Sequence, residues 1–244
     1  GETVSAVLPF KSQDLHIAQF NENRRRISLS GAQSKYSACI RDGHLELTLP
    51  GEQGTHILKP CLTDFENGAD SPANEHLTMQ IAARVFNIET AQNALCFFGS
   101  GEAAYVTKRY DIGPDGSKIQ QEDFASLGGI TSDRYGKDYK YTALSYEDIG
   151  ALIRKYIPAW RVEMVKFFGL IIFNFLFSNG DAHLKNFSVL KSNTGDYRLA
   201  PAYDLIDTQI HLPGDSIFAL QKGLFSDGRP FPLGVGHKTF EEFD

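Results

Sequence analysis

The chain has 244 residues, of which 42% are hydrophobic and 22% are charged, and this balance is typical of a soluble globular protein with one large or two small domains. Its formal net charge is -6, whereas proteins that coat nucleic acid usually have a basic surface, so the composition disfavours that role. Three widely spaced cysteines without a C-x-x-C pair imply no disulfide framework and favour a reducing, cytoplasmic compartment.

The first hundred residues contain strand-like segments. Segments 37–40 and 45–49 flank Asp42-Gly43, a dipeptide typical of a tight hairpin. The segment "THILKP" predicts a short strand that ends at Lys59, because Pro60 should stop it. A further strand is expected over 103–110, followed by a loop rich in glycine and proline.

A helix is predicted over residues 71–86. Ser71 is a plausible N-cap, and Pro72 would then occupy the first helical position. One face of this helix carries apolar residues at every fourth position, and these are Leu77, Ile81 and Val85.

The second half of the chain is richer in helices. A helix over 145–157 would be capped by Ser145, and a second helix is expected over 162–177. Its apolar run "VKFFGLIIFNFLF" is too short to span a bilayer and predicts a buried core helix, so no membrane association is expected. Short strands are expected around "FSVL" and "YRLAP".

These elements predict an α+β fold with two lobes. A strand-rich part with one helix, residues 1–110, precedes a helix-rich part, residues 111–244. The cleft between two such lobes is the natural place for a ligand.

The segment "NGDAHLKN" is the most specific chemical signal in the chain. Asp181 and Asn186 are five residues apart, which is the spacing of a protein-kinase catalytic loop. Asp204, in "PAYDLI", follows as a second carboxylate, and Mg²⁺ prefers carboxylate and carbonyl oxygens. Each residue alone has a simpler interpretation, since "SNGDAH" could be a plain turn and Asp204 could cap a helix beginning at "LIDT".

A kinase also needs a cation for the nucleotide phosphates. Lys59 ends a predicted strand and Glu75 lies early in the next predicted helix, so the two could form the lysine–glutamate pair of kinases. The alternatives are a solvated lysine at a strand end and a glutamate that merely suits the helix dipole. Lys108, Arg109 and Tyr110 lie where the lobes join, and we nominate them for contact with adenine.

Four segments, "ISLSGAQSK", "ILKP", "NGDAHLKNFS" and "PAYDL", resemble the HipA-like serine/threonine kinase toxins of bacterial toxin–antitoxin systems. The similarity extends over residues 27–205, and the chain looks most like the short HipT-type members. It implies a bilobal protein-kinase-like fold with a strand-rich N-lobe and a helix-rich C-lobe. The motif "YDL" lacks the glycine of D-F-G, so no activation-loop switch of that type is expected.

The resemblance also implies ATP and Mg²⁺ as cofactors. Asp181 is then the general base, Asn186 and Asp204 are the metal ligands, and the segment from Ser30 to Lys35 covers ATP. The implied ATP-contact positions are Ser30, Gly31, Ala32, Gln33, Ser34, Lys35, Lys59, His183, Lys185, Asn186 and Asp204.

In this family, serines at the positions of Ser28 and Ser30 are autophosphorylation sites. A phosphoserine would bring roughly −1.5 to −2 charges into the ATP-covering loop and should repel nucleotide. The neighbouring Arg24-Arg25-Arg26 run could hold the phosphoserine by charge-assisted hydrogen bonds. The alternatives are serines that are ordinary polar residues of a hairpin and arginines that belong to a solvated loop.

Family members phosphorylate aminoacyl-tRNA synthetases, which arrests translation and growth, and a helix-turn-helix antitoxin neutralises them. The resemblance therefore implies these partners, a separate small protein like the N-terminal subdomain of longer members, and contact with DNA only through the antitoxin. Two other functions stay open: a small-molecule phosphotransferase on the same fold, and a catalytically silent kinase-like binding module. The segment 128–141 is a candidate acceptor-side recognition loop or an ordinary long loop.

Overall fold

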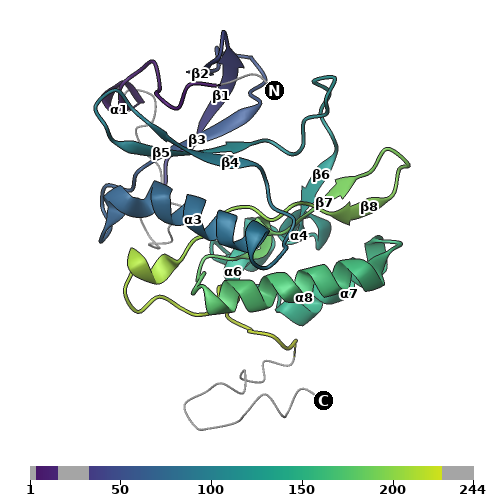
Figure 1. Ribbon diagram of the computed structural model, residues 1–244. Coiled ribbons are helices and arrows are strands. Elements are labelled where there is room, and N and C mark those ends of the chain that lie inside the picture. The colour runs from purple at the N-terminus through teal and green to yellow at the C-terminus, as the bar shows by residue number, and fades with distance from the viewer. Residues whose placement is uncertain (1–3, 16–32, 227–244) are drawn as a thin grey trace. The chain divides into compact units, whose positions relative to one another are not determined.

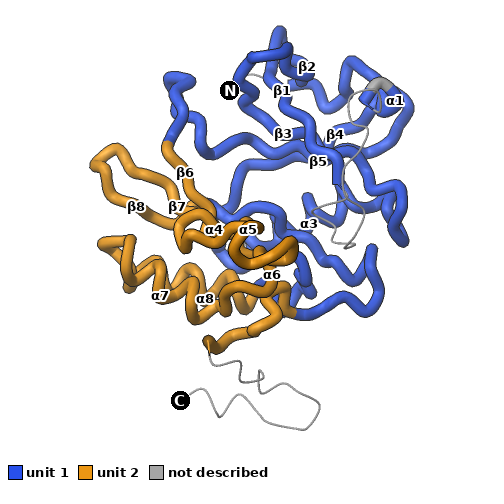
Figure 2. Tube along the Cα trace, turned by 180° about the vertical axis from the view of Figure 1, so that it is seen from behind, with its two compact units in different colours: residues 1–119, 173–181, 201–217 blue, residues 120–172, 182–200, 218–244 orange. Residues whose placement is uncertain are grey.

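The structure, a computed structural model, describes residues 4–15 and 33–226, and the chain divides into two compact units (Figures 1 and 2). Unit 1 comprises residues 1–119, 173–181 and 201–217, and unit 2 comprises 120–172, 182–200 and 218–244. Unit 1 therefore contains segments from both predicted parts of the sequence, whereas unit 2 lies entirely within residues 111–244. The assignment of 1–110 and 111–244 to two lobes by role stays a prediction.

Unit 1 contains an antiparallel five-stranded sheet with the strand order β2-β1-β3-β5-β4 (Figure 1). The hairpin between the first two strands is confirmed. Asp42 and Gly43 have φ values of 48° and 74°, the left-handed conformation that a two-residue hairpin turn requires. The strands are β1 (Tyr36–Arg41), β2 (His44–Leu47), β3 (His56–Pro60), β4 (Asn93–Phe97) and β5 (Ala103–Lys108).

Strand β3 includes Pro60, so the prediction that proline would end it at Lys59 was wrong. Pro60 pairs with Ala104 of β5, whereas the pairing with β1 already ends at Leu58. The missing N–H of proline therefore interrupts no ladder on the β1 side. As a consequence, Lys59 lies within a central strand and is not at its end.

Helix α3 (Ser71–Arg84) packs against β4 and β5 (Figure 1). Its N-cap residue is Asp70, so the predicted cap was wrong by one position, and the Ser71 hydroxyl instead accepts a hydrogen bond from the Leu62 N–H. The predicted apolar face is the outer one, since Leu77 is 60% exposed and Val85 is 72% exposed. The inner face carries Glu75, Thr78, Met79 and Ala82.

The core of unit 1 lies between the sheet and the segment near the N-terminus. A short helix, α1 (Ser12–Leu15), contributes Leu15, and Leu8 packs beside it. The other buried members are Tyr36, Ala38, Leu45, Leu58, Cys96, Phe98, Ala104 and Val106. The sequence did not predict β4, whose alternating pattern is weak.

Unit 2 is built around helices α7 (Tyr146–Tyr156) and α8 (Trp160–Leu176, of which residues up to 172 belong to this unit). The predicted cap of α7 is confirmed, because Ser145 and Asp148 form a reciprocal capping box. An antiparallel sheet, β6-β7-β8, completes the unit with β6 (Gln121–Asp123), β7 (Ser188–Lys191) and β8 (Tyr197–Leu199). Its last two strands were predicted, and β6 was not.

Segment 128–141 contains one short helix, α5 (Ser132–Tyr135), and most of a second, α6 (Tyr139–Thr142), so it is more regular than either kind of loop that we considered. Another short helix, α4 (Phe124–Leu127), precedes it. The described residues also form three single turns of 3-10 helix: η1 (Gly68–Asp70), η2 (Leu184–Asn186) and η3 (Thr208–Ile210).

Helix α8 is only half-buried, which differs from the predicted core helix. Phe167 and Ile171 belong to the core of unit 2, whereas Val162 is 60% exposed and Val165 is 74% exposed. The exposed apolar residues of this helix also include Phe168, Ile172 and Leu176. Among the described helices, none has the length and apolar character needed to cross a membrane.

Candidate active site

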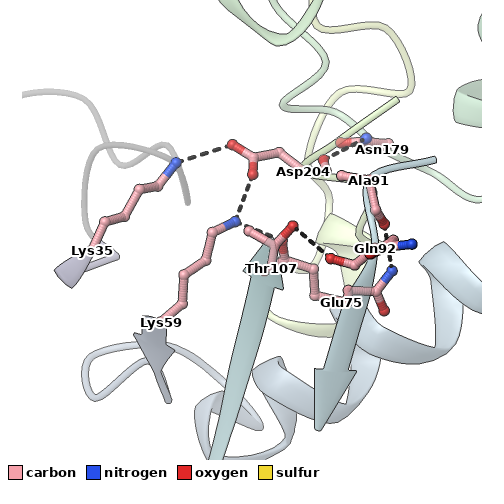
Figure 3. Close-up of polar contacts among 9 residues, drawn as sticks. Lys35, Lys59, Glu75, Ala91, Gln92, Thr107, Asn179 and Asp204 are labelled. Carbon is pink, nitrogen blue, oxygen red and sulfur yellow. Dashed lines mark hydrogen bonds and ion pairs between the residues drawn. The ribbon is translucent and has the colours of Figure 1, made fainter. Parts of the chain in front are cut away.

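A cluster of charged side chains lies in unit 1. The Lys59 ammonium is 2.5 Å from Glu75 Oε1 and 2.6 Å from Asp204 Oδ1. The side chains of Lys59 and Glu75 are 3% and 2% exposed, and that of Asp204 is 20% exposed. Figure 3 shows the ammonium between the two carboxylates. Residues from β3, from α3 and from the segment after β8 therefore meet at one point.

The fold explains why this lysine is buried. Lys59 pairs with Tyr105 across β3 and β5, and its ammonium lies 5.3 Å from the centroid of the Tyr105 ring. Glu75 lies on the buried face of α3, which packs on the same sheet. The expected lysine–glutamate pair therefore forms, and the alternative of a solvated lysine is wrong.

The charges in this cluster shift one another's pKa values. Burial alone would lower the pKa of Lys59, but Asp204 and Glu75 outweigh it and hold that pKa above its usual range. Burial would raise the pKa of Asp204, but Lys59 and Lys35 outweigh it and hold that pKa well below its usual range. Burial raises the pKa of Glu75, and Lys59 opposes this shift. Asp204 is thus held as an anion and Lys59 as a cation.

A second lysine reaches the same aspartate. Lys35 immediately precedes β1, and its ammonium is 3.0 Å from Asp204 Oδ2. Its side chain is 37% exposed, in contrast to that of Lys59. Each carboxylate oxygen of Asp204 is therefore paired with a different ammonium (Figure 3).

The backbone at Asp204 is held in an unusual conformation. Its φ is 55°, which is uncommon for a residue other than glycine and persists only where the surroundings impose it. Two residues before Asp204, Ala202 forms backbone hydrogen bonds with Glu89 and Ala91. The residue directly before Asp204 is Tyr203, whose ring centroid is 5.4 Å from that of Tyr110. The alternative role of Asp204 as a helix cap is wrong, because Asp207 caps η3.

Sequence reasoning missed Asn179, which connects two predicted site residues. Its Oδ1 accepts a hydrogen bond from the Asp181 N–H at 3.3 Å, and its Nδ2 donates to the Asp204 carbonyl oxygen at 3.3 Å and to Asn174 Oδ1 at 3.0 Å. Asn179 and Asp181 are 2% and 7% exposed. The available signal was Asn174, the amide within the otherwise apolar run of residues 167–177, which predicts a buried polar partner.

The turn before Asp181 is closely packed. The Gly180 N–H donates to Thr208 Oγ1 at 3.1 Å, and that hydroxyl donates to the Ser178 carbonyl oxygen at 2.9 Å. A Cβ on residue 180 would lie 2.2 Å from the Ser216 carbonyl oxygen, so only glycine fits. These contacts orient the backbone that carries Asp181.

Three other predicted residues lie in unit 2. His183 is buried, with its ring centroid 5.0 Å from that of Tyr141. The Lys185 ammonium is 3.3 Å from Asp123, which caps α4. Asn186 ends η2 and is 7% exposed, and its N–H donates to the His183 carbonyl oxygen. Their predicted roles stay predictions.

The nominated adenine segment is at the end of β5. Lys108 is exposed and its N–H donates to the Gln92 carbonyl oxygen. The Arg109 guanidinium forms two hydrogen bonds with Asp111, at 2.9 and 2.5 Å, so it is already occupied. Tyr110 lies beside Tyr203, and this contact connects the segment to the residue next to Asp204.

The predicted ATP-covering loop is described only in part. Gln33 and Ser34 are half-buried, and Lys35 contacts Asp204. The remaining predicted positions lie outside the described residues: Arg24, Arg25, Arg26, Ser28, Ser30, Gly31 and Ala32. Within residues 4–15 and 33–226, no group of three or more His, Cys, Asp and Glu side chains could hold a metal.

Known proteins are similar to this chain in sequence. "Putative kinase Y4mE" of Sinorhizobium fredii is 33% identical over 75% of this chain and 43% of its own length. The "Serine/threonine-protein kinase toxin HipA" of Shewanella oneidensis is 25% identical over 88% of this chain and 54% of its own length. The chain thus spans about half the length of the curated relatives that it matches.

A solved structure has the same fold. HipA of Shewanella oneidensis, in a complex with HipB and operator DNA, superposes with a TM-score of 0.64 at 22% identity, over 87% of this chain and 53% of that chain. The predicted α+β, kinase-like fold class is therefore confirmed. The sequence matches the HipA-like C-terminal domain over residues 27–234, most of the chain, so this protein belongs to the HipA-like family.

Proposed function

We propose that this chain carries the catalytic residues of an ATP- and Mg²⁺-dependent serine/threonine protein kinase that acts as a toxin. The observation that carries the proposal is the buried Lys59 ammonium between Glu75 and Asp204. A kinase needs such a lysine, held by a glutamate, near the aspartate that binds the metal. Names of relatives, a putative kinase and a kinase toxin, support the same activity.

The residues present fit ATP and Mg²⁺. Asp204 offers a carboxylate that stays ionised, and Asn186 offers an amide oxygen, both of which are ligands that Mg²⁺ accepts. Mg²⁺ commonly takes only one or two carboxylates and completes its shell with phosphates and water. Lys59 and Lys35 provide the positive charge that nucleotide phosphates require.

Each residue has a defined task in this proposal. When bound, Mg·ATP supplies the phosphoryl group that is transferred. Asp181 accepts the proton of the acceptor hydroxyl, and Asn179 orients it through the Asp181 N–H. Lys59 holds the α- and β-phosphates, and Glu75 keeps the ammonium in place. His183, Lys185 and the segment from Ser30 to Lys35 are proposed to contact ATP, as are Lys108, Arg109 and Tyr110.

The finer parts of the proposal follow from family membership. We propose an aminoacyl-tRNA synthetase as the substrate, with arrest of translation and growth as the result. Ser28 and Ser30 are the proposed autophosphorylation sites. A helix-turn-helix antitoxin is the proposed partner, by analogy with HipB in the complex of the Shewanella HipA with operator DNA, and DNA would be reached only through it.

Transfer of labelled γ-phosphate to proteins of a bacterial lysate tests the activity. We expect the wild type to label a protein of synthetase size and Asp181→Ala to lose label by about 10²–10⁴-fold, the usual contribution of a general base. Lys118→Met is the matched control, because Lys118 is exposed and lies outside the cluster.

Three outcomes would contradict the proposal. Equal labelling by Asp181→Ala and the wild type would show that Asp181 is not the general base. Label in small alcohols alone would favour a small-molecule phosphotransferase, and no transfer by any variant would favour a silent binding module. Intact-mass measurement after incubation with Mg·ATP tests the serines, and absence of phosphate from both Ser28 and Ser30 would exclude autophosphorylation there.

A further inference from the structure

Both oxygens of the Asp204 carboxylate are paired with lysines of this chain. Lys59 occupies Oδ1 at 2.6 Å and Lys35 occupies Oδ2 at 3.0 Å (Figure 3). With Glu75, the cluster has two cations and two anions, so its formal charges cancel. A divalent cation that bound Asp204 with both lysines in place would add two positive charges beside two ammoniums, which Coulomb repulsion opposes.

The two lysines differ in their freedom to leave. The Lys59 ammonium is buried, paired with Glu75 and close to the Tyr105 ring. Its departure would leave the buried Glu75 carboxylate without a cation. Lys35 contacts the Asp204 carboxylate through a side chain that is 37% exposed, and its flexible four-carbon stem extends from the residue just before β1. Lys35 is therefore the cation that can give up Asp204 at small cost.

We propose that Lys35 is a counter-ion that occupies the metal side of Asp204 in the nucleotide-free protein. It releases the carboxylate when nucleotide phosphates arrive to bind its ammonium, so metal and nucleotide bind together and metal alone is disfavoured. This inference rests on the proposed function, since it needs Asp204 to be a metal ligand. Lys35 then acts as a positioning residue for that ligand in addition to contacting ATP.

The consequence is a pair of opposite effects for one substitution. Lys35→Met keeps the apolar stem and removes the charge. We expect it to tighten binding of a divalent cation alone, because Asp204 Oδ2 becomes accessible, and to weaken binding of the metal–nucleotide complex, because a phosphate contact is lost. If Lys35 only contacted ATP, the substitution would change the affinity for the metal–nucleotide complex and leave the affinity for the cation alone unchanged.

Binding of Mn²⁺ measured by electron paramagnetic resonance, with and without ATP, tests the inference on the full chain. For Lys35→Met we expect roughly tenfold tighter Mn²⁺ binding without nucleotide and roughly tenfold weaker binding of Mn·ATP, the size expected for one partly exposed charge. Lys35→Arg keeps the cation and should resemble the wild type. Lys118→Met, with the same change in net charge at an exposed position, should also resemble the wild type.

The outcomes separate the inference from the proposed function. If the wild type binds Mn·ATP but Lys35→Met binds Mn²⁺ alone no more tightly, the counter-ion role is wrong and the kinase proposal stands. If both affinities fall together, Lys35 has a purely structural role. If Lys118→Met shows the same gain, net charge alone explains it. If the wild type does not bind Mn·ATP, both proposals are overturned.

Discussion

Two lysines contact the carboxylate of Asp204, and one of them is buried whereas the other is exposed. Lys59 lies within the central strand β3, is 3% exposed, and has Glu75 as a second partner. Lys35 precedes the sheet and is 37% exposed, with Asp204 as its carboxylate partner. The first ion pair is therefore part of the packed interior of unit 1, and the second lies at its surface. Burial decides whether the same charge contributes to stability or only to the electrostatics of the site.

The largest effect is expected from Lys59→Met. The substitution leaves Glu75 and Asp204 without the ammonium that lies between them, and breaking a buried pair on one side costs about 3–5 kcal/mol. Urea denaturation measures the loss of unfolding free energy. Adding Glu75→Gln should recover part of the stability and none of the phosphoryl transfer. A loss near zero would show that the pair is not buried in solution.

A smaller effect is expected from Asn179→Ala. The substitution removes the amide that bonds to Asn174, to the Asp181 N–H and to the Asp204 carbonyl oxygen. Leaving buried polar groups without partners costs roughly 1–3 kcal/mol. Asn193→Ala, at an exposed position, is the matched control and should change the unfolding free energy little. Equal effects of the two variants would exclude the linking role of Asn179.

Local chemistry was predictable from the sequence, and contacts between distant segments were only partly so. Asp42-Gly43 identified its hairpin and Ser145 its helix cap, because both depend on neighbouring residues. The lysine–glutamate pair was predicted because it is a known requirement of phosphoryl transfer.

The apolar face of α3 that the sequence shows is not its buried face, and the reason is physical. Both Leu77 with Val85 and Glu75 with Met79 repeat at helical spacing, and counting apolar residues favours the first pair. The ion pair of Glu75 with Lys59, a residue on another element, reverses that choice. Asn179 was missed for the same reason, since its partners include residue 204 and no local spacing indicates that contact.

Acid should weaken the contribution of Asp204. Burial, which raises its pKa, is outweighed by Lys59 and Lys35, which lower it below the value of an unfolded aspartate. A carboxyl group with a lowered folded-state pKa contributes stability above the unfolded pKa near 3.9, and loses it as pH falls further. The difference in unfolding free energy between wild type and Asp204→Asn should therefore shrink below about pH 4, by on the order of 1–2 kcal/mol.

Glu75 is present in both proteins of this comparison, and its titration affects the difference through its coupling to Asp204, whose charge adds to the effect of burial in raising the pKa of Glu75. Burial raises the pKa of Glu75, so that group has the opposite pH dependence and would obscure the trend in the wild type alone. A difference that is constant from pH 7 to pH 3 would show that Asp204 is not held as an anion by the two lysines.

The smallest effect is expected from Lys35→Met measured as stability. An ion pair with this exposure contributes less than about 1 kcal/mol, because water screens it and the long side chain loses entropy when it is held. The variant should therefore unfold within about 1 kcal/mol of the wild type, and 1 M salt should remove the remaining difference. Lys118→Met controls for the loss of one charge. A destabilisation as large as that of Lys59→Met would mean that both lysines belong to the interior, and Lys35 could then not leave Asp204 when nucleotide binds.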